Sequence, residues 1–162
     1  MMVAPAALIA AACSAGSGAG SAVADIADQT YANDQWRTLS KEDWQARLSP
    51  EAFAVLRKEA TERAFTSELN DEERSGVFHC AGCDLALFES STKYNSGTGW
   101  PSFYDVIDGA VGTKEDNTLW AARTEYHCAR CGGHQGHLFN DGPAPTGLRY
   151  CNNGVALSFK AA

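Results

Sequence analysis

Four of the six cysteines form two Cys-x-x-Cys pairs, Cys80 with Cys83 and Cys128 with Cys131, and a histidine precedes each pair. At this spacing one tight turn aims two thiolates at a single tetrahedral metal ion. Two such pairs complete a site and are better explained by a metal than by a disulfide framework. The sequence therefore predicts a structural zinc site made of four cysteines.

Cys151 stands apart from these pairs, in the segment RYCNNGVALSF. Its composition predicts a single strand from Arg149 to Phe159, in which alternate side chains share a face. Arg149, Cys151 and Asn153 then lie on one face, whose apolar end must enter the core. This places Cys151 at the rim of the core, where a nearby cation favours the thiolate. The alternative is a buried packing cysteine, the common case for a lone thiol, but the cation and the amide on its own face favour a reactive one.

Two histidines, His134 and His137, lie in a glycine-rich stretch that predicts a loop. They are candidate metal ligands, yet four cysteines already saturate a tetrahedral zinc ion. The Pro- and Gly-rich segment NDGPAPTG between His137 and Cys151 also allows the histidines to return beside the thiol. A cysteine with nearby histidines predicts nucleophilic or redox chemistry with proton transfer.

An aromatic residue, Trp100, occupies the loop SGTGWPSF, with Phe103 close behind it. Aromatic residues are usually part of the core. A tryptophan on a loop bounded by Gly and Pro is nevertheless well suited to form a pocket wall, because its ring can hold an apolar group. We interpret Trp100 as part of a binding pocket.

The composition indicates one soluble domain, since the chain has 162 residues of which 44% are hydrophobic. With 13 basic and 20 acidic residues the net charge is −7. This charge repels phosphate backbones, and no basic patch offsets it in the sequence. Nucleic acid is therefore not an expected partner.

The first 33 residues are predicted to be a flexible segment, because 14–21 read SAGSGAGS. Residues 1–12 are uncharged and have the length of a signal-peptide apolar region, and Ala10 to Cys13 resembles a lipoprotein processing site. No basic residue precedes this region, so a simple disordered tail is the alternative. Localisation in a bacterial cell envelope and in the cytoplasm both stay open, and membrane contact is expected only if Cys13 carries lipid.

The folded domain is predicted over residues 34–162, with helices first and strands later. Ser40 and Asp43 form a capping-box pattern for one helix, and Ser49 with Pro50 begins a second helix that ends before Phe65. The acidic run 68–74 predicts a loop. Short strands follow, which predicts a mainly β domain with small antiparallel sheets clamped by the metal; they are expected at 77–79, 85–88, 106–110, 119–124 and 149–159.

Several motifs together resemble the B-type methionine sulfoxide reductases over about residues 36–160. They are the two Cys-x-x-Cys pairs, KYNSGTGWPSF at 93–103 and HQGHLFNDGPAPTGLRYCNN at 134–153, in this order. The resemblance implies two antiparallel sheets in a β-tent, short N-terminal helices and one structural zinc ion remote from catalysis. It implies no organic cofactor.

The resemblance also implies an activity, the thiol-dependent reduction of methionine-R-sulfoxide, free or in proteins, to methionine. Cys151 then attacks the sulfoxide sulfur and becomes a sulfenic acid. His134, His137 and Asn153 organise and protonate the oxygen. The implied substrate-binding residues are Trp100, Phe103 and Arg149.

One departure from the family concerns the thiol that resolves the sulfenic acid. Many members carry a cysteine in the SGxGWPSF loop, where this chain has Thr98. With four cysteines assigned to zinc, Cys13 is the candidate resolving residue within the chain. Thioredoxin or a small thiol such as glutathione is the other candidate reductant.

Two other functions remain open at this point. One is a non-catalytic zinc-knuckle module that binds a peptide or protein, for which Cys151 would be dispensable. The other is a zinc hydrolase with His134 and His137 as ligands, which predicts a second zinc ion in each chain.

Overall fold

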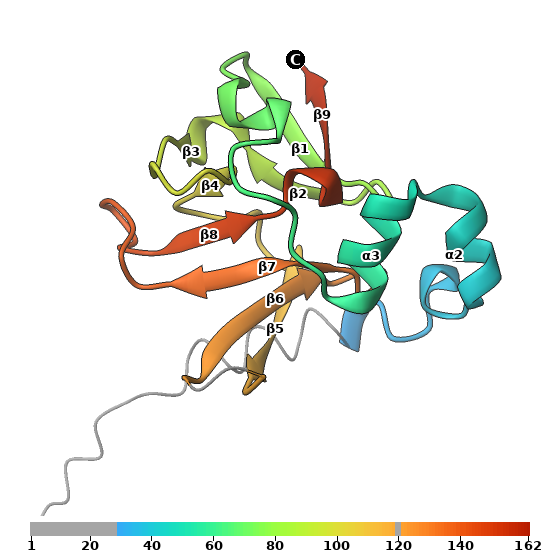
Figure 1. Ribbon diagram of the computed structural model, residues 1–162. Helices are drawn as coiled ribbons and strands as arrows, with labels where there is room; N and C mark the ends of the chain where they lie inside the picture. Colours follow the sequence, from blue (N-terminus) through green and yellow to red (C-terminus); the bar gives the residue numbers. More distant parts are fainter. Residues whose placement is uncertain (1–28, 119–120) are drawn as a thin grey trace, which may run out of the picture.

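The computed structural model describes residues 29–118 and 121–162 (Figure 1). The proposed leader, the linker and Cys13 lie outside these residues. Among the described residues, no helix combines the length and the hydropathy needed to cross a membrane.

Two short helices precede the sheets, and their caps confirm the sequence predictions. Helix α2 (Lys41–Arg47) begins at a complete capping box formed by Ser40 and Asp43. Helix α3 (Pro50–Lys58) begins after Ser49, whose side chain accepts a hydrogen bond from the amide of Ala52. A 3-10 turn, η1 (Gln35–Arg37), comes before them. Helix α3 packs on β7 of the large sheet and buries an apolar face there.

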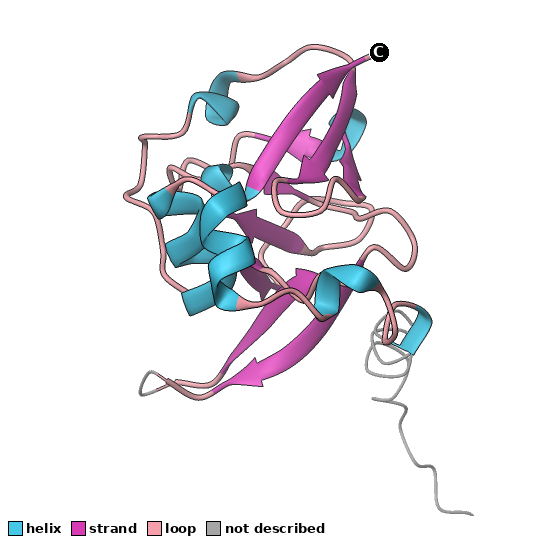
Figure 2. Ribbon diagram, turned by 90° about the vertical axis from the view of Figure 1, so that its right-hand side faces the viewer, coloured by secondary structure: helices cyan, strands magenta, loops and turns pink. Residues whose placement is uncertain are grey.

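Nine strands form two antiparallel sheets in the described part of the chain, which confirms the predicted fold class. The small sheet has the order β2-β1-β9, with β1 (Gly76–Cys80), β2 (Ala86–Glu89) and β9 (Leu157–Ala161). The large sheet has the order β3-β4-β8-β7-β6-β5, with β3 (Lys93–Tyr94), β4 (Ser102–Phe103), β5 (Val111–Asp116), β6 (Arg123–Cys128), β7 (His134–Phe139) and β8 (Arg149–Asn152). Figure 2, viewed from the helical side, shows the small sheet at the top and the β5–β6 hairpin at the bottom.

The core between the sheets is largely aromatic. Phe88 of the small sheet stacks on Phe103 of the large sheet, with ring centroids 4.1 Å apart and planes at 8°. Phe78 contacts the edge of the Phe103 ring, and Tyr126 and Tyr150 meet each other edge to face. Rings of this size each bury a large apolar area, so a few of them hold two small sheets together.

The predicted strand 149–159 is wrong as a single element. The chain leaves the large sheet after β8, makes a 3-10 turn η4 (Gly154–Ala156), and enters the small sheet as β9. The carboxylate of Glu62 fixes this turn, because it accepts hydrogen bonds from the amides of Gly154 at 2.5 Å and Val155 at 3.0 Å. A distant carboxylate thus ends a run whose composition is β-like throughout.

Three further boundaries differ from the sequence predictions. The strand expected at 119–124 is β6, which begins only at Arg123 and continues to Cys128. Residues 106–110 do not form a strand, and β5 begins directly after them at Val111. In the acidic run, the segment Glu68–Asp71 forms a 3-10 turn, η2, and the side chain of Ser67 accepts a hydrogen bond from the amide of Leu69.

Candidate active site

An open cavity of about 160 Å³ lies on the large sheet beside the loop that carries Trp100. Strands β7 and β8 form its floor. It brings together Cys151, His137, Asn153 and Trp100, which sequence analysis had selected from separate motifs. Its lining residues are Thr61, Trp100, Arg123, Gly136, His137, Phe139, Cys151, Asn152 and Asn153.

Cys151 lies in the interior of the large sheet, on β8. Its direct cross-strand neighbours are Ser102 on β4 and His137 on β7, so all three side chains share one face. The other face of β8 carries Tyr150, which packs in the core. Cys151 is half-buried and carries a free thiol, which matches the sheltered but reachable position predicted for it.

Burial raises the pKa of the Cys151 thiol, because the thiolate loses solvation. The positive charge of Arg149 and a hydrogen bond from Thr98 act in the opposite direction. The thiol is therefore mostly protonated at neutral pH and needs a base beside it to become a nucleophile.

The predicted loop around His134 and His137 is instead strand β7. Residues three apart normally point to opposite faces of a strand. Here Tyr126 pairs with Gly136 while the next residue, His127, pairs with His134. Gln135 is the extra residue of a β-bulge, and this bulge brings both histidines to the same face. Their ring centroids lie 5.5 Å apart.

Gly136 follows the bulge at a point where two backbones nearly touch. A Cβ atom at this position would lie 1.9 Å from the carbonyl oxygen of Cys151. Only glycine permits this approach, which sets the distance between β7 and the strand that carries the thiol.

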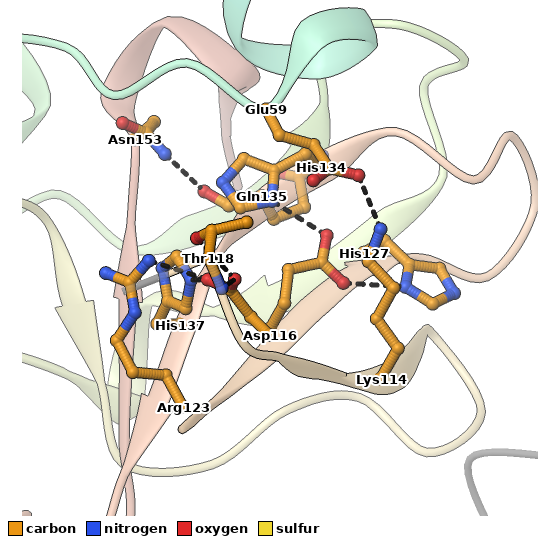
Figure 3. A network of polar contacts seen from close by, with 11 residues as sticks. Glu59, Lys114, Asp116, Thr118, Arg123, His127, His134, Gln135, His137 and Asn153 are labelled. Atoms are coloured by element: carbon orange, nitrogen blue, oxygen red, sulfur yellow. Dashed lines mark hydrogen bonds and ion pairs between the residues drawn. The ribbon is translucent and has the colours of Figure 1, made fainter. Parts of the chain in front are cut away.

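His137 belongs to a polar cluster at the end of β5 (Figure 3). Its Nε2 lies 2.7 Å from Oδ2 of Asp116, which also accepts a hydrogen bond of 2.6 Å from Nη2 of Arg123. Burial lowers the pKa of His137, and the hydrogen bond with Asp116 partly reverses this. His137 therefore meets the cavity with one ring nitrogen already bound to a carboxylate.

His134 is fixed by a contact with the carboxylate of Glu125. Its Nδ1 lies 2.7 Å from Oε1 of Glu125, whose other oxygen lies 3.1 Å from Nδ1 of His127. Burial opposes ionisation of Glu125, but the two histidines outweigh burial and lower its pKa to about 2. His134 is only 3% exposed and lies outside the lining of the cavity. Its Nε2 is buried without a hydrogen-bond partner among the described residues.

Asn153 and Trp100 are fixed by main-chain groups. The Asn153 side chain accepts from the amide of Glu62 at 3.0 Å and donates to the carbonyl of Gln135 at 2.9 Å. Nε1 of Trp100 donates to the carbonyl of Glu62 at 3.2 Å. The segment after α3 thus orients both walls of the cavity.

Two residues that were predicted to bind substrate, Phe103 and Arg149, are not among the residues that line the cavity. Phe103 is fully buried in the core against Phe88 and lies outside the cavity, so the structure does not support the substrate contact expected of it. Arg149 shares the face of Cys151, but its guanidinium forms a bidentate pair with Asp141 at 2.8 and 2.9 Å. It also lies over the ring of Phe139, at 4.2 Å from the centroid.

Sequence analysis missed the carboxylates of this site. Asp116 and Glu125 lie on β5 and β6, in a stretch that carried no recognised motif. Glu125 is a direct cross-strand neighbour of His137, and Asp116 of Arg123. An alternating pattern of charged residues in RTE, at 123–125, was the one available signal, and it does not tell which histidine each carboxylate will meet.

The four cysteines of the two pairs form one cluster, in which all sulfur atoms lie within 4.8 Å of one another. Tetrahedral zinc with bonds of about 2.3 Å would hold its sulfurs about 3.8 Å apart. The contacts of 3.7 Å between Cys80 and Cys131 and 3.5 Å between Cys83 and Cys128 fit this geometry. Each turn closes with a left-handed residue after its second cysteine, Asp84 at φ 62° and Gly132 at φ 67°.

Two side chains outside the pairs contact this cluster. Nη1 of Arg57 donates to the carbonyl of Cys131 at 3.1 Å, and its Nη2 lies 3.5 Å from the sulfur of Cys131. Nε2 of Gln135 lies 3.3 Å from the sulfur of Cys80. Cation and amide donors of this kind stabilise metal-bound thiolates. Because Gln135 is also the bulged residue of β7, the cluster and the histidines share one structural element.

Comparison with known proteins agrees with this geometry. The model of the SelR domain family matches residues 48–161. A protein named peptide methionine sulfoxide reductase MsrB, from Leptospira interrogans, is 51% identical over 122 residues, which cover 75% of this chain and 93% of that protein. Proteins of the same name are 53% identical in Methanosarcina barkeri, over 75% of this chain and 86% of that protein, and 53% identical in Pseudomonas putida strain W619, over 74% and 90%.

The matched region contains the whole cavity, the four clustered cysteines and both sheets. Similarity at this level over most of the chain, together with the site described above, confirms the resemblance seen in the sequence. The chain belongs to the SelR domain family, that of the B-type methionine sulfoxide reductases.

Proposed function

We propose that this chain reduces methionine-R-sulfoxide, in peptides or proteins, to methionine, with Cys151 as the attacking thiol. One observation supports this most directly. A free, half-buried thiol faces an imidazole across two paired strands, inside a cavity with an indole in its wall. This arrangement combines a nucleophile, a proton carrier and an apolar surface.

The first half of the reaction, from the Cys151 thiol to its sulfenic acid, needs no electrons from another molecule. The proton of the Cys151 thiol passes to His137, and the thiolate sulfur bonds to the sulfoxide sulfur. The oxygen accepts the proton from His137 and moves from the substrate sulfur to the sulfur of Cys151, which becomes a sulfenic acid. The bond between the two sulfur atoms breaks, and the thioether leaves as methionine. The sulfur of Cys151 is oxidised by two electrons and the substrate sulfur is reduced by two.

Different residues of the site are proposed to have different roles in this reaction. We assign proton transfer to His137, because it lines the cavity and is the direct neighbour of Cys151. His134 supports it from a buried position. Trp100 and Phe139 offer an apolar surface for the methyl group, and Asn153 carries an amide whose orientation is fixed by two main-chain bonds.

The four-cysteine cluster is proposed to hold one zinc ion that is structural. All four sulfurs are buried, and a tetrahedral ion would have no open position for substrate. Zinc would supply folding free energy and would fix the turn that leads into β7. A hydrolase that uses His134 and His137 as zinc ligands is disfavoured, since the four cysteines are the one group of three or more possible metal ligands found among the described residues.

The sulfenic acid must be returned to a thiol by a second thiol. Among the described residues, the cysteines other than Cys151 all belong to the metal cluster. Thr98 contacts Cys151 through its hydroxyl and offers no sulfur. We propose that thioredoxin or a small thiol attacks the sulfenic acid, with Cys13 as the alternative resolving residue within the chain.

The decisive variant is Cys151→Ser, with metal content checked. We expect reduction of a dabsylated methionine-R-sulfoxide to fall at least a thousandfold while the unfolding transition stays in place, because the nucleophile is lost but no packing atom is. Undiminished turnover would reject Cys151 as the nucleophile. No turnover by the wild-type protein, with fold and metal site intact, would favour a non-catalytic zinc-knuckle module that binds a peptide or protein.

The matched control is Cys13→Ser, which makes the same chemical change at the remaining cysteine of the sequence, the one outside both Cys-x-x-Cys pairs. With dithiothreitol as reductant, the control should keep full turnover. With thioredoxin, a selective loss in the control would identify Cys13 as the resolving thiol, and unchanged turnover would show direct attack by the reductant.

A further inference from the structure

Asp116 is the last residue of β5 and receives four hydrogen bonds. Its Oδ1 accepts from the amide and the hydroxyl of Thr118, at 3.0 and 2.6 Å. Its Oδ2 lies 2.6 Å from Nη2 of Arg123 and 2.7 Å from Nε2 of His137. Figure 3 shows Thr118, Arg123 and His137 converging on this one carboxylate. Both oxygens are therefore committed.

These contacts keep Asp116 ionised and determine which nitrogen of His137 carries a proton. The hydrogen bonds from Thr118, followed by those from His137 and Arg123, hold the pKa of Asp116 far below its usual range. An ionised carboxylate can only accept hydrogen bonds. Nε2 of His137 must therefore carry a proton, at any pH at which the protein is folded and this contact is kept.

Several charged or titratable groups face His137 from the neighbouring strands. Arg123, Glu125 and Asp116 come from β5 and β6, His134 from β7 itself, and Cys151 from β8. Glu125 is occupied by two other histidines. Arg123 and His134 disfavour a second proton on His137, whereas Asp116 favours it. Asp116 thus supplies the stabilisation that an imidazolium needs in this half-buried position.

We propose that Asp116 is a positioning residue that holds one proton on Nε2 of His137, so that Nδ1 is the nitrogen that takes the thiol proton and gives it to the sulfoxide oxygen. Nδ1 is the ring nitrogen nearer the backbone of β7, and Cys151 is the direct neighbour of His137 across the strands. After the transfer, His137 is neutral and its remaining proton stays with Asp116. This assignment rests on the function proposed above.

The test uses Asp116→Asn, which keeps the size of the side chain and removes its charge. In protein labelled with ¹⁵N-histidine, we expect wild-type His137 to show the Nε2–H tautomer when neutral. In the variant the tautomers should mix, and the midpoint of the His137 titration should fall by about 1 to 3 pH units, since an opposite charge at this distance is lost. The acidic limb of kcat/KM for methionine-R-sulfoxide should move to lower pH with it, because His137 must be neutral to take the thiol proton.

The matched control is Glu115→Gln, which removes the same charge from the neighbouring, exposed position of β5. It should leave the titration of His137 in place. An Asp116→Asn protein that folds and keeps the wild-type tautomer and midpoint would overturn the proposal. A loss of activity that is equal at every pH, with an unchanged titration, would also overturn it, because that is the result of a merely structural role. The titration needs no substrate, so it is independent of whether the chain reduces the sulfoxide.

Discussion

Burial has the largest effect on the pKa of the Cys151 thiol, and two side chains of opposite charge act on it as well. Arg149 favours the thiolate, while Asp141, its bidentate partner, disfavours it. Burial raises the pKa of Cys151 further. At the scale of single residues, the charges of Arg149 and Asp141 therefore act in opposite directions on one sulfur, and each charge can be removed separately.

The two partners should give opposite results when they are replaced. Arg149→Met removes a cation and should raise the pKa of Cys151 by about 1 unit, whereas Asp141→Asn removes an anion and should lower it. Below its pKa the thiolate fraction changes tenfold for each unit. The rate of iodoacetamide labelling of Cys151 at pH 8, followed by peptide mass mapping, should therefore fall about tenfold in the first variant and rise in the second. Shifts in the same direction would contradict this electrostatic account.

The bulge at Gln135 decides what β7 presents to the cavity. Without the extra residue, His134 and His137 would point to opposite faces. The backbone carbonyl of Gln135 accepts hydrogen bonds from both the backbone and the side chain of Asn153. The side-chain amide of Gln135 contacts the sulfur of Cys80 in the four-cysteine cluster. At the scale of secondary structure, one irregular residue connects the histidines, the asparagine and the cysteine cluster.

Gly136 is the position in β7 at which an added side chain should disturb the strand pairing most. Gly136→Ala would place a Cβ atom 1.9 Å from the carbonyl oxygen of Cys151, so β7 and β8 must separate. We expect a loss of about 3 kcal/mol in the free energy of unfolding, measured by urea denaturation, together with a large fall in kcat/KM.

The control for this prediction is Gly109→Ala. Gly109 also needs a glycine-like backbone, with φ 71°, but has open space around its Cβ position. Its replacement should cost about 1 to 2 kcal/mol from backbone strain and leave kcat/KM unchanged. Equal effects of the two substitutions would show that the close approach to Cys151 is not what matters.

The four-cysteine cluster joins the two sheets of the molecule. Cys80 ends β1 of the small sheet, and Cys128 ends β6 of the large sheet. Arg57 ties helix α3 to the same cluster and stacks on the ring of Trp44. The helices, the small sheet and the large sheet therefore meet at one site, which is proposed to hold zinc.

Removal of the metal should unfold much of the chain. Structural zinc sites contribute about 10 to 16 kcal/mol, comparable with the whole stability of a domain. We expect a strong chelator to release one zinc ion per chain, with loss of the far-ultraviolet circular dichroism signal and of activity in parallel. A metal-free protein that keeps its thermal transition would exclude a structural role for the ion.

Some features were determined by the sequence alone because they depend on neighbouring residues. The capping box at Ser40, the cap at Ser49 and the paired knuckles at Cys80 and Cys128 were all predicted correctly. The importance of Cys151 was inferred from its neighbours, although the strand used in that argument does not exist as one element. The sharing of a face by Arg149 and Cys151 survives, since both lie within β8.

The remaining features were decided by the tertiary structure. Asp116 meets His137, and Glu62 ends β8, through contacts between residues far apart in the chain. Phe103 looked like a pocket residue and is a core residue, because the partner ring of Phe88 comes from the other sheet. Local patterns specify caps, turns and metal-binding pairs, but strand register and the position of a bulge depend on which strands pair and on which face is buried. Those pairings exist only once the two sheets have packed around the aromatic core.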